Sequence, residues 1–130
     1  MPLYGVAQSG WNPPPNQGLN LASLEVGEHI TLFNGTETPS VGLKSVAFAL
    51  GIQGANRGSK TFWCSGMTAG SVIDIQAANQ DVDSEYSSVS GALTPDANGN
   101  VSYPDDGQSA FYRAVLTTST GAMPIVIVQR

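Results

Sequence analysis

Charge is scarce in this sequence of 130 residues, because only 12% of them are Asp, Glu, Lys or Arg. The 5 basic residues are scattered and are outnumbered by 10 acidic ones, so the formal net charge is −5. Nucleic-acid binding needs a basic stripe that displaces counterions from phosphates, so we expect no nucleic-acid partner. Polarity comes instead from Ser, Thr, Asn, Gln and Gly. Uncharged polar surfaces suit contact with other proteins, because few ions lose their water.

Histidine and cysteine are almost absent, since His29 and Cys64 are the only residues of these types. A lone cysteine permits no intramolecular disulfide, which fits synthesis in a reducing cytoplasm. Zinc sites take several such ligands, so we predict no metal site and no cofactor. We expect His29 to be half-exposed on a strand and Cys64 to be a buried, inert thiol.

Targeting and catalytic signals are lacking as well. The first five residues have neither a basic region nor an apolar stretch, so no signal peptide is predicted. No apolar run approaches the about 18 residues that span a bilayer, so no membrane partner is expected. No Gly-x-Ser-x-Gly elbow supports Ser-His-Asp catalysis, and we predict that the chain is not an enzyme.

Short apolar segments separated by turn residues make up the chain after residue 20. Ile73, Ile75 and Ala77 alternate with polar residues, which is typical of a strand with one buried face. Asn34-Gly35 is a strong turn signal. Residues 21–130 therefore predict one all-β domain, an antiparallel β-sandwich or jelly-roll-like barrel of about eight short strands. The expected strands cover 21–26, 29–33, 46–50 (a short helix being the alternative within 41–52), 60–64, 71–78, 85–93, 101–103, 110–118 and 124–128.

Residues 1–20 are predicted to form an extended, proline-rich N-terminal arm. Pro13, Pro14 and Pro15 lack backbone donors and favour a polyproline conformation, which excludes a helix. Tyr4 and Trp11 are large aromatics on this arm, and we expect them to pack on the domain or to anchor a neighbouring subunit. Disorder is the alternative.

Residues 72–130 contain a succession of short motifs. A strand with Ile-Asp-Ile-Gln-Ala leads to Asn-Gln-Asp at 79–81 and to Tyr86, and later come Phe-Tyr-Arg-Ala at 111–114, a Thr-Ser-Thr-Gly turn and a β-branched last strand. This succession resembles the small β-sandwich domains of tailed-phage virion proteins, which occur in capsid decoration (cement) and tail-associated proteins. The usual glycine after the Asx turn is replaced by Val-Asp at 82–83. The resemblance implies an oligomeric structural protein fixed to a larger lattice.

The glycine-rich segment before Lys60 has the wrong residue order for a phosphate loop. Two interpretations of this segment remain. It is either a flexible loop whose Arg57 and Lys60 contact an acidic neighbour, or a solvated loop without such a contact. The residues expected to contact partners are therefore Tyr4, Trp11, Pro13, Pro14, Pro15, Arg57 and Lys60.

Charged residues in the second half have structural interpretations. Asp81, Asp83 and Glu85 alternate and supply oxygen ligands for calcium, but they lack the EF-hand layout, so a solvated acidic turn is preferred. Arg113 is expected either to stack on an aromatic ring or to pair with a carboxylate such as Asp74.

The resemblance, together with the low charge and the aromatic arm, implies a virion protein that decorates the outside of a phage shell. It would bind the major capsid protein or other virion proteins, bridge capsomers, and act as a homo-oligomer, with a trimer favoured. One alternative is a tail or head-to-tail component. Another is a carbohydrate-binding β-sandwich module that uses Trp11, Trp63 and Tyr103 as aromatic platforms.

Overall fold

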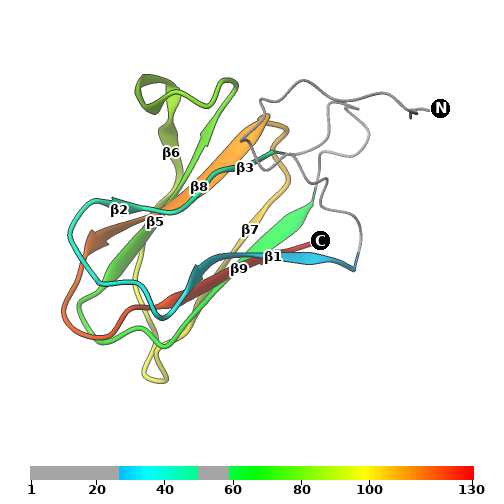
Figure 1. The fold of residues 1–130 in the computed structure, drawn as a ribbon. Helices are drawn as coiled ribbons and strands as arrows, with labels where there is room; N and C mark the ends of the chain where they lie inside the picture. Colours follow the sequence, from blue (N-terminus) through cyan, green and yellow to red (C-terminus); the bar gives the residue numbers. More distant parts are fainter. Residues whose placement is uncertain (1–26, 50–58) are drawn as a thin grey trace, which may run out of the picture.

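A computed structural model describes residues 27–49 and 59–130, which fold into two antiparallel sheets packed face to face (Figure 1). Sheet A has the strand order β1-β9-β4-β7. Sheet B has the order β2-β8-β5-β6, with β3 also paired to β8. The strands are β1 (His29–Asn34), β2 (Leu43–Lys44), β3 (Phe48–Ala49), β4 (Lys60–Ser65), β5 (Val72–Ala78), β6 (Ser87–Leu93), β7 (Val101–Asp105), β8 (Phe111–Thr118) and β9 (Ile125–Gln129), and a 3-10 turn, η3, spans Asp83–Glu85.

Most connections cross from one sheet to the other. Among the described strands, β5 and β6 are the one consecutive pair that lies side by side. The turn at Asn34 and Gly35 therefore does not close a hairpin, but leads the chain from β1 in sheet A to β2 in sheet B. The prediction of an antiparallel β-sandwich is confirmed. Most strands that are neighbours in a sheet come from distant parts of the sequence.

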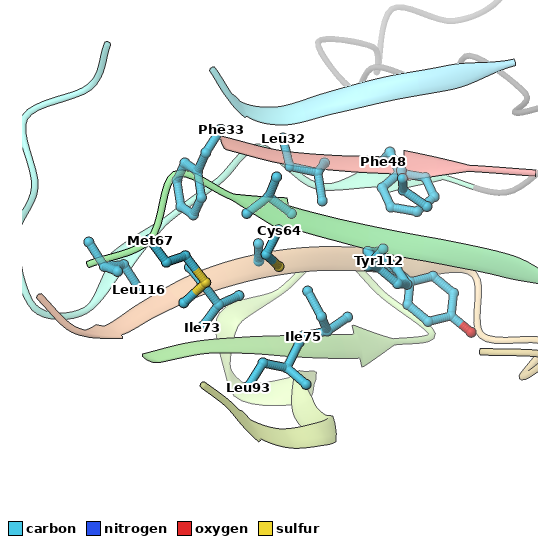
Figure 2. Packing of buried hydrophobic residues seen from close by; sticks show 14 of the residues in the cluster. Leu32, Phe33, Phe48, Cys64, Met67, Ile73, Ile75, Leu93, Tyr112 and Leu116 are labelled. Atoms are coloured by element: carbon cyan, nitrogen blue, oxygen red, sulfur yellow. The ribbon is translucent and has the colours of Figure 1, made fainter. Parts of the chain in front are cut away.

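The core lies between the sheets and is built by alternation along the central strands (Figure 2). Ile73, Ile75 and Ala77 of β5 point inward as predicted, opposite the buried side chains of β4 and β9. One end of the core is aromatic: Phe48 and Tyr112 stack with their ring centroids 5.7 Å apart. Burial of such side chains contributes about 1.5–3 kcal/mol each, so this layer supplies much of the driving force for folding.

The predicted strand boundaries differ from the observed ones at particular residues. The expected strand over 46–50 is shorter, and two small strands, β2 and β3, lie one after the other along β8 instead of one longer strand. The strand expected over 101–103 extends to Asp105, so Pro104 lies within β7. It is tolerated because β7 is an edge strand of sheet A, where a missing backbone donor interrupts no sheet. The expected strand 21–26 lies outside the described residues.

Candidate binding surface

The outer face of sheet A is exposed and carries no Asp, Glu, Lys or Arg. It arises from the same alternation that builds the core: Phe62 and Cys64 of β4 point inward, so Trp63 between them points outward. We call this face the Trp63 surface. It consists of His29, Thr31, Thr61, Trp63, Ser65, Ser102, Pro104, Ile125, Ile127 and Gln129.

Trp63 stands in the middle of this surface, with 51% of its area exposed. Its direct neighbours across the sheet are Ile127 on β9 and Ser102 on β7. A buried tryptophan contributes far more to folding than a half-exposed one, so its outward position is not explained by core packing. An exposed tryptophan surrounded by short side chains is available to a ligand.

Two shallow hollows flank Trp63. The smaller, of about 260 Å³, is lined by His29, Trp63, Ile127 and Gln129. The larger, of about 380 Å³, lies toward β7 and the loop that precedes it, and its lining residues are Trp63, Cys64, Ser65, Asp96, Asn100, Val101 and Ser102. Its volume is within the range of about 300–1,000 Å³ that small-molecule sites span.

The loop before β7 is held by Asp96. Its Oδ1 accepts hydrogen bonds from the backbone N–H groups of Asn98 at 2.8 Å and Asn100 at 2.9 Å. The Asp96 N–H donates to the Asn100 carbonyl at 2.9 Å, which closes the loop on itself. Gly99 has a φ of +82° and lies against the Met67 backbone, so the loop is anchored to the domain. Asp96 and Asn100 are therefore held in fixed positions at the rim of the larger hollow.

Lys60 contradicts the expectation of a partner contact, because its side chain is buried in the domain. Lys60 is 2% exposed, and its Nζ lies 2.9 Å from Asp105 Oδ2 and 4.3 Å from the centre of the Tyr112 ring. The ammonium also donates to the Gly107 carbonyl at 3.0 Å. Burial lowers the pKa of Lys60, while the Asp105 carboxylate opposes that shift. Its acidic neighbour thus belongs to the same chain, and Lys60 closes one end of the core.

Arg113 has the structural role predicted for it, with different partners. Its guanidinium lies 3.8 Å from the Tyr86 ring centre, and its Nη1 donates to Asp83 Oδ1 at 2.6 Å. Asp74, the predicted carboxylate, instead accepts hydrogen bonds from Ser88 and Gln76. The Arg113 hydrogen bond chiefly lowers the pKa of Asp83. Arg113 therefore fastens the segment before β6 onto the outer face of sheet B.

The acidic turn at residues 81–85 is partly engaged in these contacts. Asp81 accepts a hydrogen bond from the Tyr86 hydroxyl at 2.7 Å, and Asp83 pairs with Arg113. Within residues 27–49 and 59–130, no three His, Cys, Asp or Glu side chains are grouped in a way that could hold a metal ion.

Cys64 and His29 occupy contrasting places. Cys64 is 2% exposed, so the predicted burial of its thiol is confirmed, and this burial raises the thiol pKa to about 12. His29 lies on the edge strand β1 and is exposed, which is more open than the half-exposed position predicted.

Two of the aromatic residues predicted as sugar platforms, Trp63 and Tyr103, lie in the described part of the chain, and they point to opposite faces of sheet A. Trp63 is exposed, but Tyr103 points inward: its ring packs 6.2 Å from Phe62 and its hydroxyl donates to the Val89 carbonyl at 2.8 Å. Tyr103 is therefore no platform. The remaining predicted contact residues lie outside the described part of the chain: Tyr4, Trp11, Pro13, Pro14, Pro15 and Arg57.

Sequence reasoning did not find Asp96, Asn100 or Ser102 as site residues. The alternation of residues 60–65 was enough to place Trp63 opposite Phe62 and Cys64. It gave no sign that β7 and its preceding loop would lie beside Trp63, because that neighbourhood depends on the order of strands in sheet A.

Comparisons with protein-family models, with curated proteins and with solved structures found no match to this chain. The described residues contain no helix that is long and apolar enough to cross a bilayer.

Proposed function

We propose that the chain is a structural protein of a phage virion, of the decoration or cement type, that binds the outside of the shell and bridges capsomers. The observation that carries this proposal is the placement of Val41 and Val46. They are the most exposed large apolar side chains described, at 74% and 65%, and both lie on the segment that carries β2 and β3. Val41 precedes β2 and Val46 follows it, at one edge of sheet B. Exposed apolar side chains at a sheet edge favour contact with another protein.

The proposed contact extends beyond this edge of sheet B. Residues 50–58, which contain Arg57, directly follow β3 in the sequence and would contribute to the same attachment. Residues 1–20 would reach neighbouring capsomers, with Tyr4 and Trp11 as aromatic anchors and Pro13–Pro15 stiffening the arm. Many weak contacts, repeated by the symmetry of a trimer on the shell, would then oppose the pressure of packaged DNA.

A binding role, with no catalysis and no cofactor, is consistent with how the domain uses its reactive groups. Lys60 and Arg113 are engaged in internal ion pairs, and the Cys64 thiol is buried with a raised pKa. Catalytic groups need access to a substrate as well as a tuned pKa.

Cosedimentation with shells tests the proposal. The chain would be mixed with purified shells of the major capsid protein encoded in the same genome, and bound copies would be counted. We expect saturable binding that weakens at least tenfold in the Val41→Asp/Val46→Asp double variant and on removal of residues 1–20. Val89→Asp is the matched control, because Val89 is 37% exposed on β6, at the opposite edge of sheet B. Full-length protein that ignores the shells, or equal losses in all variants, would overturn the proposal.

A tail or head-to-tail component is distinguished by the assembly of the isolated protein. Rings with six-fold or twelve-fold order in electron micrographs would assign the chain to that part of the virion. Trimers that bind shells would retain the decoration role.

A further inference from the structure

We propose that the larger hollow beside Trp63 is a binding site for neutral hexopyranose sugars. In this site the C–H face of a sugar ring packs on the Trp63 indole, while Asp96, Asn100 and the nearby serines bind its hydroxyls. The site lies on sheet A, whereas the proposed shell contact uses the β2–β3 edge of sheet B. The inference is therefore independent of the proposed function, and the two are compatible in one molecule.

The aromatic half of the site is a fixed platform. Trp63 lies on β4, a central strand of sheet A that pairs with both β9 and β7, so its backbone is held from two sides. Its 51% exposure leaves part of the indole open to a ligand. A pyranose ring has one face made of C–H groups, and such a face complements the negative face of an indole.

The polar half of the site has unused hydrogen-bonding groups. Ser65, Asn100 and Ser102 line the hollow, and their side chains make no hydrogen bond to any other residue that the structure describes. Asp96 uses Oδ1 for the loop, while Oδ2 makes no hydrogen bond to the described residues. A carboxylate acceptor beside an amide, which both donates and accepts, is suited to a pair of neighbouring sugar hydroxyls.

The charge at the site selects among sugars. Asp96 is the charged residue in the lining, and the hollow contains no Lys or Arg. A sialic acid, uronic acid or sulfated sugar would bring a second negative charge to the Asp96 carboxylate without a compensating cation. A neutral hexopyranose gives Asp96 hydroxyl donors and no repulsion.

A protein ligand is the other class that an exposed tryptophan fits. Protein contact areas place a tryptophan at the centre of a desolvated, apolar patch. In the larger hollow Trp63 instead shares the lining with an acid, an amide and two serines, besides Cys64 and Val101. Those polar groups favour a hydroxyl-rich ligand, because an apolar partner would leave them dehydrated and unpaired.

The test is an NMR titration of the full-length, indole-labelled chain, combined with a glycan array. Glucose, galactose, mannose and their β- and α-linked oligosaccharides are the probes. We expect the indole N–H signal of Trp63 to shift saturably with at least one neutral sugar. The dissociation constant should be on the order of 0.1–10 mM for a single small site. Trp11 supplies an internal reference signal, which is assigned with the Trp11→Phe variant.

Three substitutions separate the site from the rest of the Trp63 surface. Trp63→Ala and Asn100→Ala should each weaken sugar binding at least tenfold. Ile127→Ala is the control, because Ile127 neighbours Trp63 in the sheet but lines the other hollow, and its affinity should stay within twofold. Thermal unfolding shows whether each variant is folded. If Trp63→Ala does not fold, Asn100→Ala still tests the site.

Several results would overturn the inference. These are an array without neutral-sugar binding, sugar binding that survives both Trp63→Ala and Asn100→Ala, or a preference for acidic sugars. Trp63-dependent binding to a protein without any sugar binding would assign the surface to that protein instead. Shell binding that is unchanged in Trp63→Ala would leave the proposed function standing whatever the sugar result.

Discussion

The Lys60 ammonium lies 2.9 Å from the Asp105 carboxylate, and both side chains are buried at one end of the sandwich. The side chain of Lys60 is 0% exposed and that of Asp105 is 11% exposed. The Tyr112 hydroxyl also donates to Asp105 Oδ2 at 2.9 Å, and its ring lies under the ammonium. The carboxylate and the aromatic ring offset the free-energy cost of removing the Lys60 ammonium from water.

Removing the carboxylate should destabilise the domain strongly. Asp105→Ala leaves the Lys60 ammonium and the Tyr112 hydroxyl buried without their shared acceptor, so we expect a loss of about 3–5 kcal/mol. Equilibrium unfolding in urea measures the loss. The control is Asp106→Ala, the next residue, which is exposed and should change stability by less than about 0.5 kcal/mol. Equal effects of the two substitutions would mean that the buried ion pair contributes nothing specific.

The ionisation of Asp105 should also make the stability of the folded domain depend on pH. Burial raises the pKa of Asp105, but hydrogen bonds from Lys60 and Tyr112 and the Lys60 charge outweigh it, so the folded-state pKa lies below its usual value. The ionised carboxylate therefore stabilises the folded state. This contribution is present above a pH of about 4, the unfolded value, and is lost as the pH falls through the lower folded pKa.

Urea midpoints between pH 2 and pH 6 measure this dependence. The difference in stability between the natural chain and Asp105→Asn should shrink steadily below a pH of about 4. The pKa values of Asp83 and Glu37 are lowered as well, but both residues are present in each protein and cancel in the difference. A difference that stays constant down to pH 2 would contradict the expected titration.

Lys60 and Arg113 show how far the sequence alone could predict the structure. Alternation is local, so it placed Lys60 on the strand that carries Phe62 and gave Arg113 its structural role. The partners could not be predicted in the same way, because they come from segments brought close by strand order. Lys60 meets Asp105 across the β4–β7 ladder, and Arg113 meets Asp83 from the turn before β6.

The candidate site was also predictable only in part, because the local pattern bears on single residues and the strand order sets their neighbours. Trp63 was expected as an aromatic platform and is exposed, whereas Tyr103 was expected as one and is inward. Both lie on alternating strands, and the short segment around Tyr103 does not reveal which face meets the core. The larger hollow needs β7 beside β4, which the sequence does not encode locally.

Arg113 should not be replaceable by lysine. Arg113→Lys keeps the positive charge, but a lysine cannot donate to Gln76 and Asp83 while it stacks on Tyr86. We expect a loss of about 1–3 kcal/mol in urea unfolding, since Arg113 is 7% exposed. Lys44→Ala is the control, because Lys44 reaches the same Asp83 only at 4.0 Å with its side chain 47% exposed. It should cost less than about 0.5 kcal/mol, and a loss as small as this for Arg113→Lys would place the stabilisation in charge alone.

Gly99, the one glycine in the loop that positions Asn100, should not tolerate alanine. Its φ is +82°, and an added Cβ would lie 2.8 Å from the Met67 carbonyl oxygen, a backbone atom that cannot move aside. Left-handed strain of about 1–2 kcal/mol and the steric conflict together predict a loss of about 2–4 kcal/mol for Gly99→Ala.

Gly91→Ala separates the two causes, because Gly91 has a φ of +69° with nothing within 4 Å of its added Cβ. It should therefore show the left-handed strain alone, about 1–2 kcal/mol, in the same thermal and urea unfolding measurements. If both substitutions cost the same, the contact with Met67 is not what holds the loop. In that case the fixed position of Asn100 beside Trp63 would depend on the Asp96 hydrogen bonds alone.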